Sequence, residues 1–301
     1  MEVTVVGAGV IGLMTALSLE QHGHRVRIVA AATGAQITSA VAGAVWFPYR
    51  TGPADKVAGW ASRTRAWLED LARTTPSAGV DVLTGYEITP TSDEPWWSAA
   101  CAIEWVPAPV IGAPGAWKFV APRCEPAIFM PWLEAQLVAT IERRVVTELA
   151  AEAGDVIINC TGLGSRELCN DNELQPIQGQ VLITAPGQAD LGLTITDDRD
   201  PDAIFYVIPR RGELVVGGIA RAWTGADPPP IDDGITKRIL RQAAALGIAV
   251  GDVRTINTGL RPFRASVRLE REGRIIHNYG HGGAGYTLAR GCAEDVVALL
   301  G

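Results

Sequence analysis

The sequence predicts an α/β protein of two interleaved domains, and three stretches carry this prediction. The first, residues 3–29, has the pattern of a strand, a glycine-rich turn, an amphipathic helix and a second strand. The second, residues 155–162, is an apolar run ending in Asn-Cys-Thr-Gly, which is typical of a buried parallel strand. The third, residues 275–287, is a strand that leads through glycines into a C-terminal helix. Together they predict a parallel sheet flanked by helices.

The turn after the first strand has the pattern G-x-G-x-x-G, with its glycines at Gly7, Gly9 and Gly12. The first glycine permits a tight turn, the second lets the backbone approach a pyrophosphate, and the third lets the helix pack closely on the strand. The helix that follows offers N–H groups and a positive dipole end to an anion. We therefore predict a Rossmann-like domain whose dinucleotide site is formed by Gly7, Ala8, Gly9, Val10, Ile11 and Gly12. A tight turn without a ligand is the alternative.

The second strand lacks the acidic residue that usually follows it and binds the adenosine ribose. Ala31 and Ala32 stand there instead. We expect backbone groups, or the hydroxyls of Thr33, Thr38 or Ser39, to bind the ribose.

Composition excludes several classes of protein. The formal net charge of −7 over 301 residues argues against a nucleic-acid partner, and no apolar run is long enough for a membrane span. The five cysteines include no C-x-x-C pair, so we expect no metal site and reduced thiols in a cytoplasmic protein, with a Cys101–Cys124 bridge as the less favoured alternative. The N-terminus enters the first strand directly, so we expect no signal peptide.

Changes in the pattern along the chain predict the domain boundaries. We expect a nucleotide-binding domain from residues 1–50, 128–175 and 256–301, and a second, α+β domain on a mixed or antiparallel sheet from residues 51–127 and 176–255. Apolar periodicity predicts helices at about 57–73, 130–141 and 235–246 and a short strand at 144–149.

Two further stretches suit a large planar ligand. Residues 34–50 are small up to Ala44 and bulky up to Tyr49, which fits either the wall of a pocket for a flat ring system or a tightly packed loop. The second glycine turn, at residues 280–285, lies at the opposite end of the sequence from the first. Two such turns suit an elongated cofactor such as FAD, with the pyrophosphate at one turn and the flavin at the other.

Several pieces of the chain match one family in the same order. They are residues 7–12, 42–49, 159–162, 206–209, 259–262, 267–272 and 277–283. On these pieces the chain resembles the D-amino acid oxidases, an FAD-dependent family that includes D-aspartate oxidase. The match spans nearly the whole chain.

The resemblance implies roles for particular residues. Arg261 would pair bidentately with the substrate α-carboxylate, Tyr206 would bond the same carboxylate, and the Gly283 carbonyl would receive the substrate amino group. Tyr49 completes the catalytic set and lies, with Val45 and Phe47, near the substrate side chain. The further cofactor contacts that it implies are Gly43, Ala44, Val45, Val146, Thr161, Gly162, Gly282, Gly283, Ala284, Gly285, Tyr286 and Thr287.

The chain also departs from the family pattern. Animal members carry a second active-site tyrosine on a lid, where this chain has residues 201–204, so we expect a short lid and a more open entrance. Phe47 replaces a residue that is polar in some members, and Arg290 replaces a usual Trp. His277 and His281 lie beside glycine turns, and we do not expect either to act as a general base.

The resemblance implies FAD-dependent oxidative deamination of D-amino acids to 2-oxo acids, ammonia and hydrogen peroxide. The expected route is hydride transfer from Cα to flavin N5, with a D-amino acid and oxygen as small-molecule partners. A glycine- or sarcosine-type amine oxidase, a quinone-linked FAD dehydrogenase and a non-catalytic flavin-binding protein are the alternatives, and an NAD(P)-dependent dehydrogenase is disfavoured. The sequence leaves open the preferred D-amino acid and whether the chain forms a homodimer.

Overall fold

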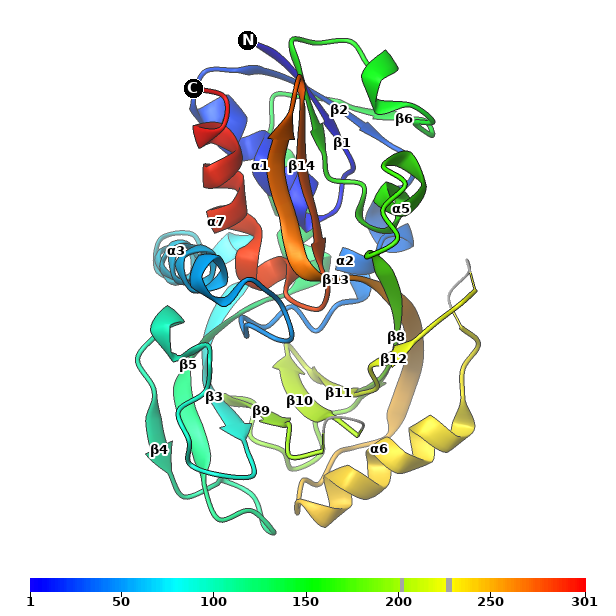
Figure 1. Ribbon diagram of the computed structural model, residues 1–301. Helices are drawn as coiled ribbons and strands as arrows, with labels where there is room; N and C mark the ends of the chain where they lie inside the picture. The colour runs from blue at the N-terminus through cyan, green and yellow to red at the C-terminus, as the bar shows by residue number, and fades with distance from the viewer. Residues whose placement is uncertain (201–202, 226–228) are drawn as a thin grey trace. The chain divides into compact units, whose positions relative to one another are not determined.

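A computed structural model of the chain describes residues 1–200, 203–225 and 229–301 (Figure 1). It divides into two compact units. Unit 1 contains Met1–Asp81, Cys124–Pro176 and Arg261–Gly301, and unit 2 contains Val82–Arg123 and Ile177–Leu260. Each unit is therefore assembled from segments that are far apart in the sequence.

The core of unit 1 is a parallel sheet. Its strands run in the order β14 (Ile275–His281), β7 (Val156–Asn159), β1 (Glu2–Val6), β2 (Arg25–Ala30) and β6 (Ile141–Arg143). The strand β13 (Val253–Glu272) pairs antiparallel with β14 along its second half. Because β1, β7 and β14 are parallel, the segments that follow them meet at one edge of the sheet, where open α/β sheets bind ligands.

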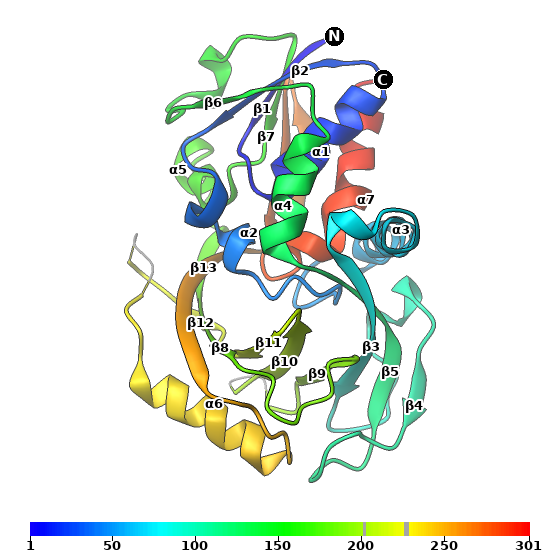
Figure 2. The same cartoon turned by 180° about the vertical axis from the view of Figure 1, so that it is seen from behind.

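Helices pack beside this sheet. The helices α1 (Val10–Gln21) and α7 (Gly285–Ala298) lie against each other, α3 (Ala54–Thr74) packs on α7, and α4 (Pro126–Ala135) packs on α1, as the view from behind in Figure 2 shows. A Cβ at Gly291 of α7 would lie 2.4 Å from Trp60 Cα of α3, so only glycine permits this approach. This packing puts α3 in unit 1, whereas the sequence suggested a boundary at residue 50.

Short elements complete unit 1, and two expected boundaries were wrong. The helix expected at 130–141 is α4, which ends at Ala135, because the Val138 and Ala139 N–H groups donate to the Glu20 carboxylate at 2.9 and 2.7 Å. The strand expected at 144–149 is instead β6, which ends at Arg143. The remaining elements are η1 (Gly34–Gln36), α2 (Thr38–Val41), η2 (Pro76–Ala78), η4 (Leu149–Ala151), η5 (Gly162–Gly164) and α5 (Ser165–Leu168).

Unit 2 is built on a mixed sheet, as the sequence predicted. Its strands run in the order β4 (Glu104–Val106), β5 (Ala116–Cys124), β3 (Val80–Ile88), β9 (Leu193–Asp197), β10 (Phe205–Arg210), β11 (Glu213–Gly217) and β8 (Gln175–Thr184). The pair β3–β9 is parallel, whereas β9–β10, β10–β11 and β11–β8 are antiparallel. The two-residue strand β12 (Arg221–Ala222) pairs with β8, and η3 (Ser98–Ala100) precedes β4.

One helix, α6 (Asp233–Ala245), covers a face of this sheet. Asp232 caps it by accepting hydrogen bonds from Gly234 N and Ile235 N. Its residues Ile235, Ile239 and Ala243 join the apolar core that β8, β10 and β11 contribute.

Three features are absent from the described parts of the chain. No helix there combines the length and apolar character needed to cross a membrane. Within the same residues, no group of three or more His, Cys, Asp or Glu residues is arranged to hold a metal ion. The five cysteines form no disulfide in the structure that these residues adopt.

Candidate active site

The turn between β1 and α1 requires its glycines. Gly7 has a φ of +114°, and a Cβ there would lie 2.3 Å from the Cys160 carbonyl oxygen. A Cβ at Gly12 would lie 1.9 Å from the Gly7 carbonyl oxygen. Because both obstacles are backbone atoms, no side-chain movement could relieve the overlap. The turn is therefore a tight backbone cradle at the N-terminus of α1.

Three predicted cofactor segments converge at this helix N-terminus. Val10 N donates to Ser39 Oγ at 3.0 Å, and the Tyr286 hydroxyl donates to the Ser39 carbonyl oxygen at 2.8 Å. A Cβ at Gly285, which begins α7, would lie 3.5 Å from Val10 Cγ1. The two glycine turns therefore lie next to each other, although they come from opposite ends of the sequence. The link through Ser39 is a contact that sequence patterns do not show.

The turn after β7 is organised by Asn159. Its Oδ1 accepts from Thr161 N at 3.2 Å, from Thr161 Oγ1 at 2.8 Å and from Ser165 Oγ at 3.2 Å. Gly162, the next residue in the turn, has a φ of +57°. The predicted cofactor residues Thr161 and Gly162 are thus held in a defined turn at the carboxyl edge of the sheet.

Three of the predicted catalytic residues lie together in unit 1. A Cβ at Gly283 would lie 3.0 Å from Tyr49 Cδ1 and 3.6 Å from Arg261 Cδ. Gly282 N donates to the Pro262 carbonyl oxygen at 2.8 Å, which ties the glycine turn to the strand segment that carries Arg261. Gly283 itself is exposed, so its backbone is open to a ligand. The arrangement combines a guanidinium group, a phenol ring and an accessible backbone.

The segment before Tyr49 is fixed by hydrogen bonds. The Thr287 hydroxyl accepts from Phe47 N at 3.1 Å and donates to the Phe47 carbonyl oxygen at 2.9 Å, and both residues are buried. Cys124 N donates to the Ala44 carbonyl oxygen at 2.9 Å, and Ala44 has a φ of +59°, a strained conformation for a non-glycine residue. Because its hydroxyl serves the Phe47 backbone, Thr287 is left with its own backbone for the predicted cofactor contact.

Other predicted residues lie in plainer surroundings. Ala31 and Thr38 are exposed, while Ala32, Gly43 and Val45 are half-buried. The Val146 side chain packs against the core cluster of Val6, Leu149 and Ile157. Of the expected short lid, Pro201 and Asp202 lie outside the described residues.

The two histidines of β14 are buried and suited to the neutral state. His281 is 3% exposed, and burial lowers its pKa to about 3. Burial also lowers the pKa of His277.

In unit 2, the Tyr206 ring packs against Gly217 and Gly218. Tyr206 lies opposite Gly217 in the β10–β11 ladder. A Cβ at Gly217 would lie 2.3 Å from Tyr206 Cζ, and one at Gly218 would lie 2.6 Å from Tyr206 Cε1. The ring therefore lies directly over the Gly217–Gly218 backbone. The Gly-Gly pair at the end of β11 was a sequence signal that the predictions did not use.

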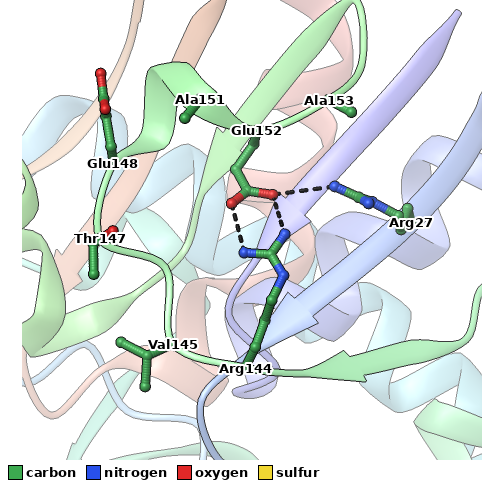
Figure 3. Close-up of a pocket in the computed structure, with 8 residues that line it drawn as sticks. All are labelled: Arg27, Arg144, Val145, Thr147, Glu148, Ala151, Glu152 and Ala153. Carbon is green, nitrogen blue, oxygen red and sulfur yellow. Dashed lines mark hydrogen bonds and ion pairs between the residues drawn. The ribbon is translucent and has the colours of Figure 1, made fainter.

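A separate pocket in unit 1 contains none of the predicted site residues. It has a volume of about 400 Å³ and is shown in Figure 3. Within it, the Arg27 guanidinium lies 3.1 Å from the Glu152 carboxylate. The Arg144 guanidinium donates two hydrogen bonds to the same carboxylate, at 2.8 and 2.5 Å. These bonds lower the pKa of the Glu152 carboxyl, with the hydrogen bond from Arg144 as the largest cause. Glu142 also pairs with both arginines, at 3.5 Å from Arg27 and 2.7 Å from Arg144, so two carboxylates offset the two guanidinium charges.

Comparison with known proteins identifies the family. The DAO family of FAD-dependent oxidoreductases matches residues 2–299. The chain belongs to this family. A protein named D-amino-acid oxidase from Rubrobacter xylanophilus is 39% identical over 318 residues, covering 99% of this chain and 95% of its own length. One of the same name from Streptomyces coelicolor is 38% identical, with 99% and 96% coverage.

Solved structures agree on the fold. Glycine oxidase from Geobacillus kaustophilus has a TM-score of 0.79 at 17% identity, covering 99% of this chain and 94% of its own. Glycine oxidase from Bacillus cereus has a TM-score of 0.78 at 20% identity, with the same coverage. The fold is therefore that of FAD-dependent oxidases, as predicted.

FAD is the cofactor of the family, and unit 1 fits it. Gly7 and Gly12 let the turn close tightly against neighbouring backbone, and the N–H groups of α1 beyond Val10, whose own N–H donates to Ser39, remain available to an anion there. The acidic ribose ligand is replaced by Ala31 and Ala32. The cofactor binding and the oxidoreductase class predicted from the sequence are thus confirmed.

Proposed function

We propose that this protein oxidises D-amino acids, with water and oxygen as co-substrates, to 2-oxo acids, ammonia and hydrogen peroxide. The carrying observation is the cluster of Arg261, Tyr49 and Gly283. It combines a cation for a carboxylate with a backbone acceptor for an amine, which are the two groups that every α-amino acid presents. The names of the two bacterial relatives support the choice of D-amino acids.

We propose unit 1 as the FAD-binding unit. The pyrophosphate would lie at residues 7–12 beside Ser39, the ribose against backbone near Ala31 and Ala32 or the Thr38 hydroxyl, and the adenine against the Val146 backbone. The isoalloxazine would lie among residues 43–45, 161–162 and 282–287. FAD, when bound, supplies the two-electron chemistry and passes the electrons to oxygen.

The protein's own contribution is to bind and orient the substrate. The Arg261 guanidinium would hold the α-carboxylate through two parallel N–H bonds, since its fork matches a carboxylate and stays charged. The Gly283 carbonyl oxygen would accept a hydrogen bond from the substrate amine. We propose unit 2 as the substrate-binding unit, with the Tyr206 hydroxyl as its own hydrogen-bond donor for a carboxylate.

Chirality follows from this set of contacts. Fixing the carboxylate, the amine and the Cα–H leaves one direction for the side chain, toward Val45 and Phe47. Those two side chains are apolar, so we propose neutral or hydrophobic D-amino acids as the preferred substrates. Positioning of this kind supplies much of the rate in reactions that need no protein acid or base.

The test is Arg261→Ala, assayed with D-alanine and D-phenylalanine. Hydrogen bonds to a charged partner contribute about 1.5–3 kcal/mol each, so loss of two raises KM by roughly 100-fold or more. FAD absorbance is expected to stay with the protein. Arg25→Ala is the matched control, because the Arg25 side chain is 85% exposed and pairs only on the surface, with Glu2. A KM unchanged by Arg261→Ala contradicts the proposal.

A further inference from the structure

A buried hydrogen-bond relay leads to the Thr161 turn from the opposite end of Asn159. The Asn159 amide nitrogen donates to Cys169 Sγ at 3.2 Å and lies 3.3 Å from His277 Nδ1. Since the amide oxygen accepts from the Thr161 N–H, the amide cannot be reversed without facing donor to donor. Asn159 and His277 are 0% and 2% exposed, so water does not replace these partners.

The position of the proton on His277 follows from its two neighbours. Because the Asn159 amide nitrogen can only donate, His277 Nδ1 must accept, which leaves the ring proton on Nε2. Nε2 lies 3.2 Å from Glu272 Oε2 and donates to it. Glu272 therefore selects the tautomer that Asn159 requires. The order of the relay is Glu272, His277, Asn159, and then the Thr161 turn.

We propose that this relay positions the Thr161–Gly162 turn for FAD and makes FAD affinity depend on the protonation of His277. A proton on Nδ1 would place two donors face to face, the imidazole N–H and the Asn159 amide N–H. Asn159 would then move and lose its hydrogen bonds to the Thr161 turn. His277, Asn159 and Glu272 are thus positioning residues. The inference rests on the proposed placement of this turn at the cofactor.

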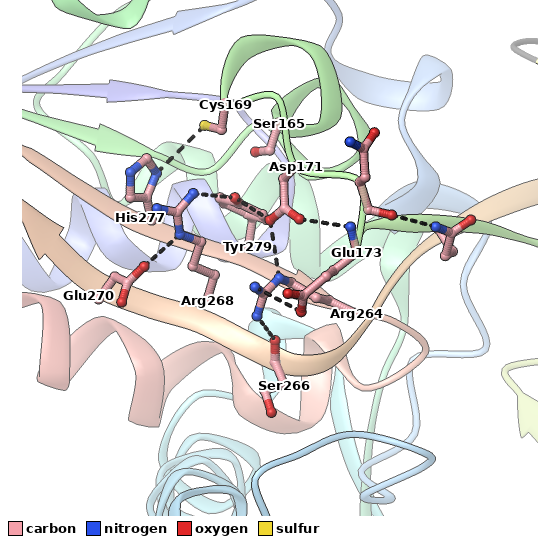
Figure 4. A network of polar contacts seen from close by, with 12 residues as sticks. Ser165, Cys169, Asp171, Glu173, Arg264, Ser266, Arg268, Glu270, His277 and Tyr279 are labelled. Atoms are coloured by element: carbon pink, nitrogen blue, oxygen red, sulfur yellow. Dashed lines mark hydrogen bonds and ion pairs between the residues drawn. The ribbon is translucent and has the colours of Figure 1, made fainter.

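Figure 4 shows Cys169, Arg268, Glu270 and Tyr279 around His277. The net effect of its surroundings is to lower the pKa of His277. Burial is the largest cause of the lowered His277 pKa, followed by the positive charge of Arg268 on β13. Glu272 and Glu270, also on β13, act in the opposite direction and raise that pKa. The Tyr279 ring meets the imidazole edge-on at 5.7 Å, and Cys169 Sγ lies 3.8 Å from Nδ1. Burial raises the pKa of the Cys169 thiol and also the pKa of the Tyr279 phenol, so both groups stay neutral.

The sign of the pH effect follows directly. The FAD-bound form requires neutral His277, so the apoprotein must lose any proton there on binding. FAD affinity is therefore full well above the His277 pKa and falls as pH drops through it, below the ordinary histidine value of about 6.5. The limit for one proton is a tenfold rise in Kd per pH unit.

The experiment is titration of apoprotein with FAD, followed by flavin fluorescence, between pH 5 and pH 7.5. In the wild type, Kd rises toward pH 5. In Asn159→Asp a carboxylate faces Nδ1, so the site needs a proton between them and Kd rises toward pH 7.5 instead. In Glu272→Gln the charge that favours protonation of His277 is removed, and the wild-type curve moves to lower pH.

His22→Gln is the matched control, because His22 bonds only the Ser18 carbonyl of its own helix and is not buried, and its curve should overlay the wild type. Thermal unfolding identifies any variant that fails to fold. If Asn159→Asp fails to fold, the Kd-against-pH curves of the wild type and Glu272→Gln test the proposal. A wild-type Kd equal at pH 5 and pH 7.5, or an Asn159→Asp curve of wild-type sign, overturns the relay and leaves the proposed function standing. Apoprotein that binds no FAD at any pH overturns both.

Discussion

The seat of Tyr206 can be tested with a single methyl group. Gly217→Ala adds a Cβ 2.3 Å from Tyr206 Cζ and 2.6 Å from its hydroxyl oxygen. Carbon atoms normally touch at about 3.5 Å, so the ring must move by roughly 1 Å. Gly217 is itself buried in β11, so the backbone has little room to yield. The substitution therefore displaces the phenol without changing its chemistry.

The expected loss of binding free energy is that of the hydrogen bond from the Tyr206 hydroxyl, which the displaced ring can no longer align. A bond from the Tyr206 hydroxyl to a substrate carboxylate is worth about 1.5–3 kcal/mol, which corresponds to roughly a 10- to 150-fold change in an equilibrium constant. We expect this loss in KM for D-amino acids and in the Kd of benzoate, a carboxylate probe. FAD affinity should change little.

The assay compares steady-state kinetics and benzoate titration in a double-mutant cycle. Gly217→Ala is made alone and together with Tyr206→Phe. If the glycine acts by seating the hydroxyl, it has little effect on KM once the hydroxyl is gone. Gly59→Ala is the control, because a Cβ there meets no atom closer than 3.9 Å. Equal effects of Gly217→Ala in both backgrounds would refute the reasoning.

Three further perturbations have clear expected outcomes. Gly12→Ala puts a Cβ 1.9 Å from the Gly7 carbonyl oxygen, and we expect loss of FAD binding, measured by absorbance of the purified protein. Thr287→Val leaves two buried backbone groups of Phe47 without their partner, at roughly 1–3 kcal/mol each, so Tm should fall measurably in a thermal melt. Burial, followed by the charge of Asp198, raises the pKa of Glu87 to about 7, from 4.5. This protonated form stabilises the fold below pH 4.5, and about 3 kcal/mol is lost as pH rises to 7 and above. Glu87→Gln should therefore melt above the wild type at pH 8, with the gap closing near pH 4.5; a constant gap would contradict this.

The parts of the fold that sequence predicted are those set by local patterns. The glycines at 7–12 act within one βαβ unit, and the strand ending at Asn159 is one continuous apolar run, so each local pattern identified the edge of the sheet. Helix α4 was misplaced because its end depends on Glu20, which lies more than 100 residues away in sequence. Propensity carries no information on such a contact.

The site shows the same division. The resemblance supplied Arg261, Tyr49 and Gly283, and the structure brings these three residues together. It did not reveal that Ser39 bonds the first turn of α1, or that Asn159 joins His277 to Thr161. Those links are side-chain hydrogen bonds between distant segments, and a single sequence has no period or spacing that encodes them.

The most direct measurement is the anaerobic visible spectrum of the FAD-loaded protein, with D-alanine or D-phenylalanine added, and then each L-enantiomer. We expect the D form alone to bleach the flavin band, and admission of oxygen to restore it with release of hydrogen peroxide. A flavin band that neither enantiomer bleaches, or that the L form bleaches equally, would contradict the assignment to D-amino acid oxidation.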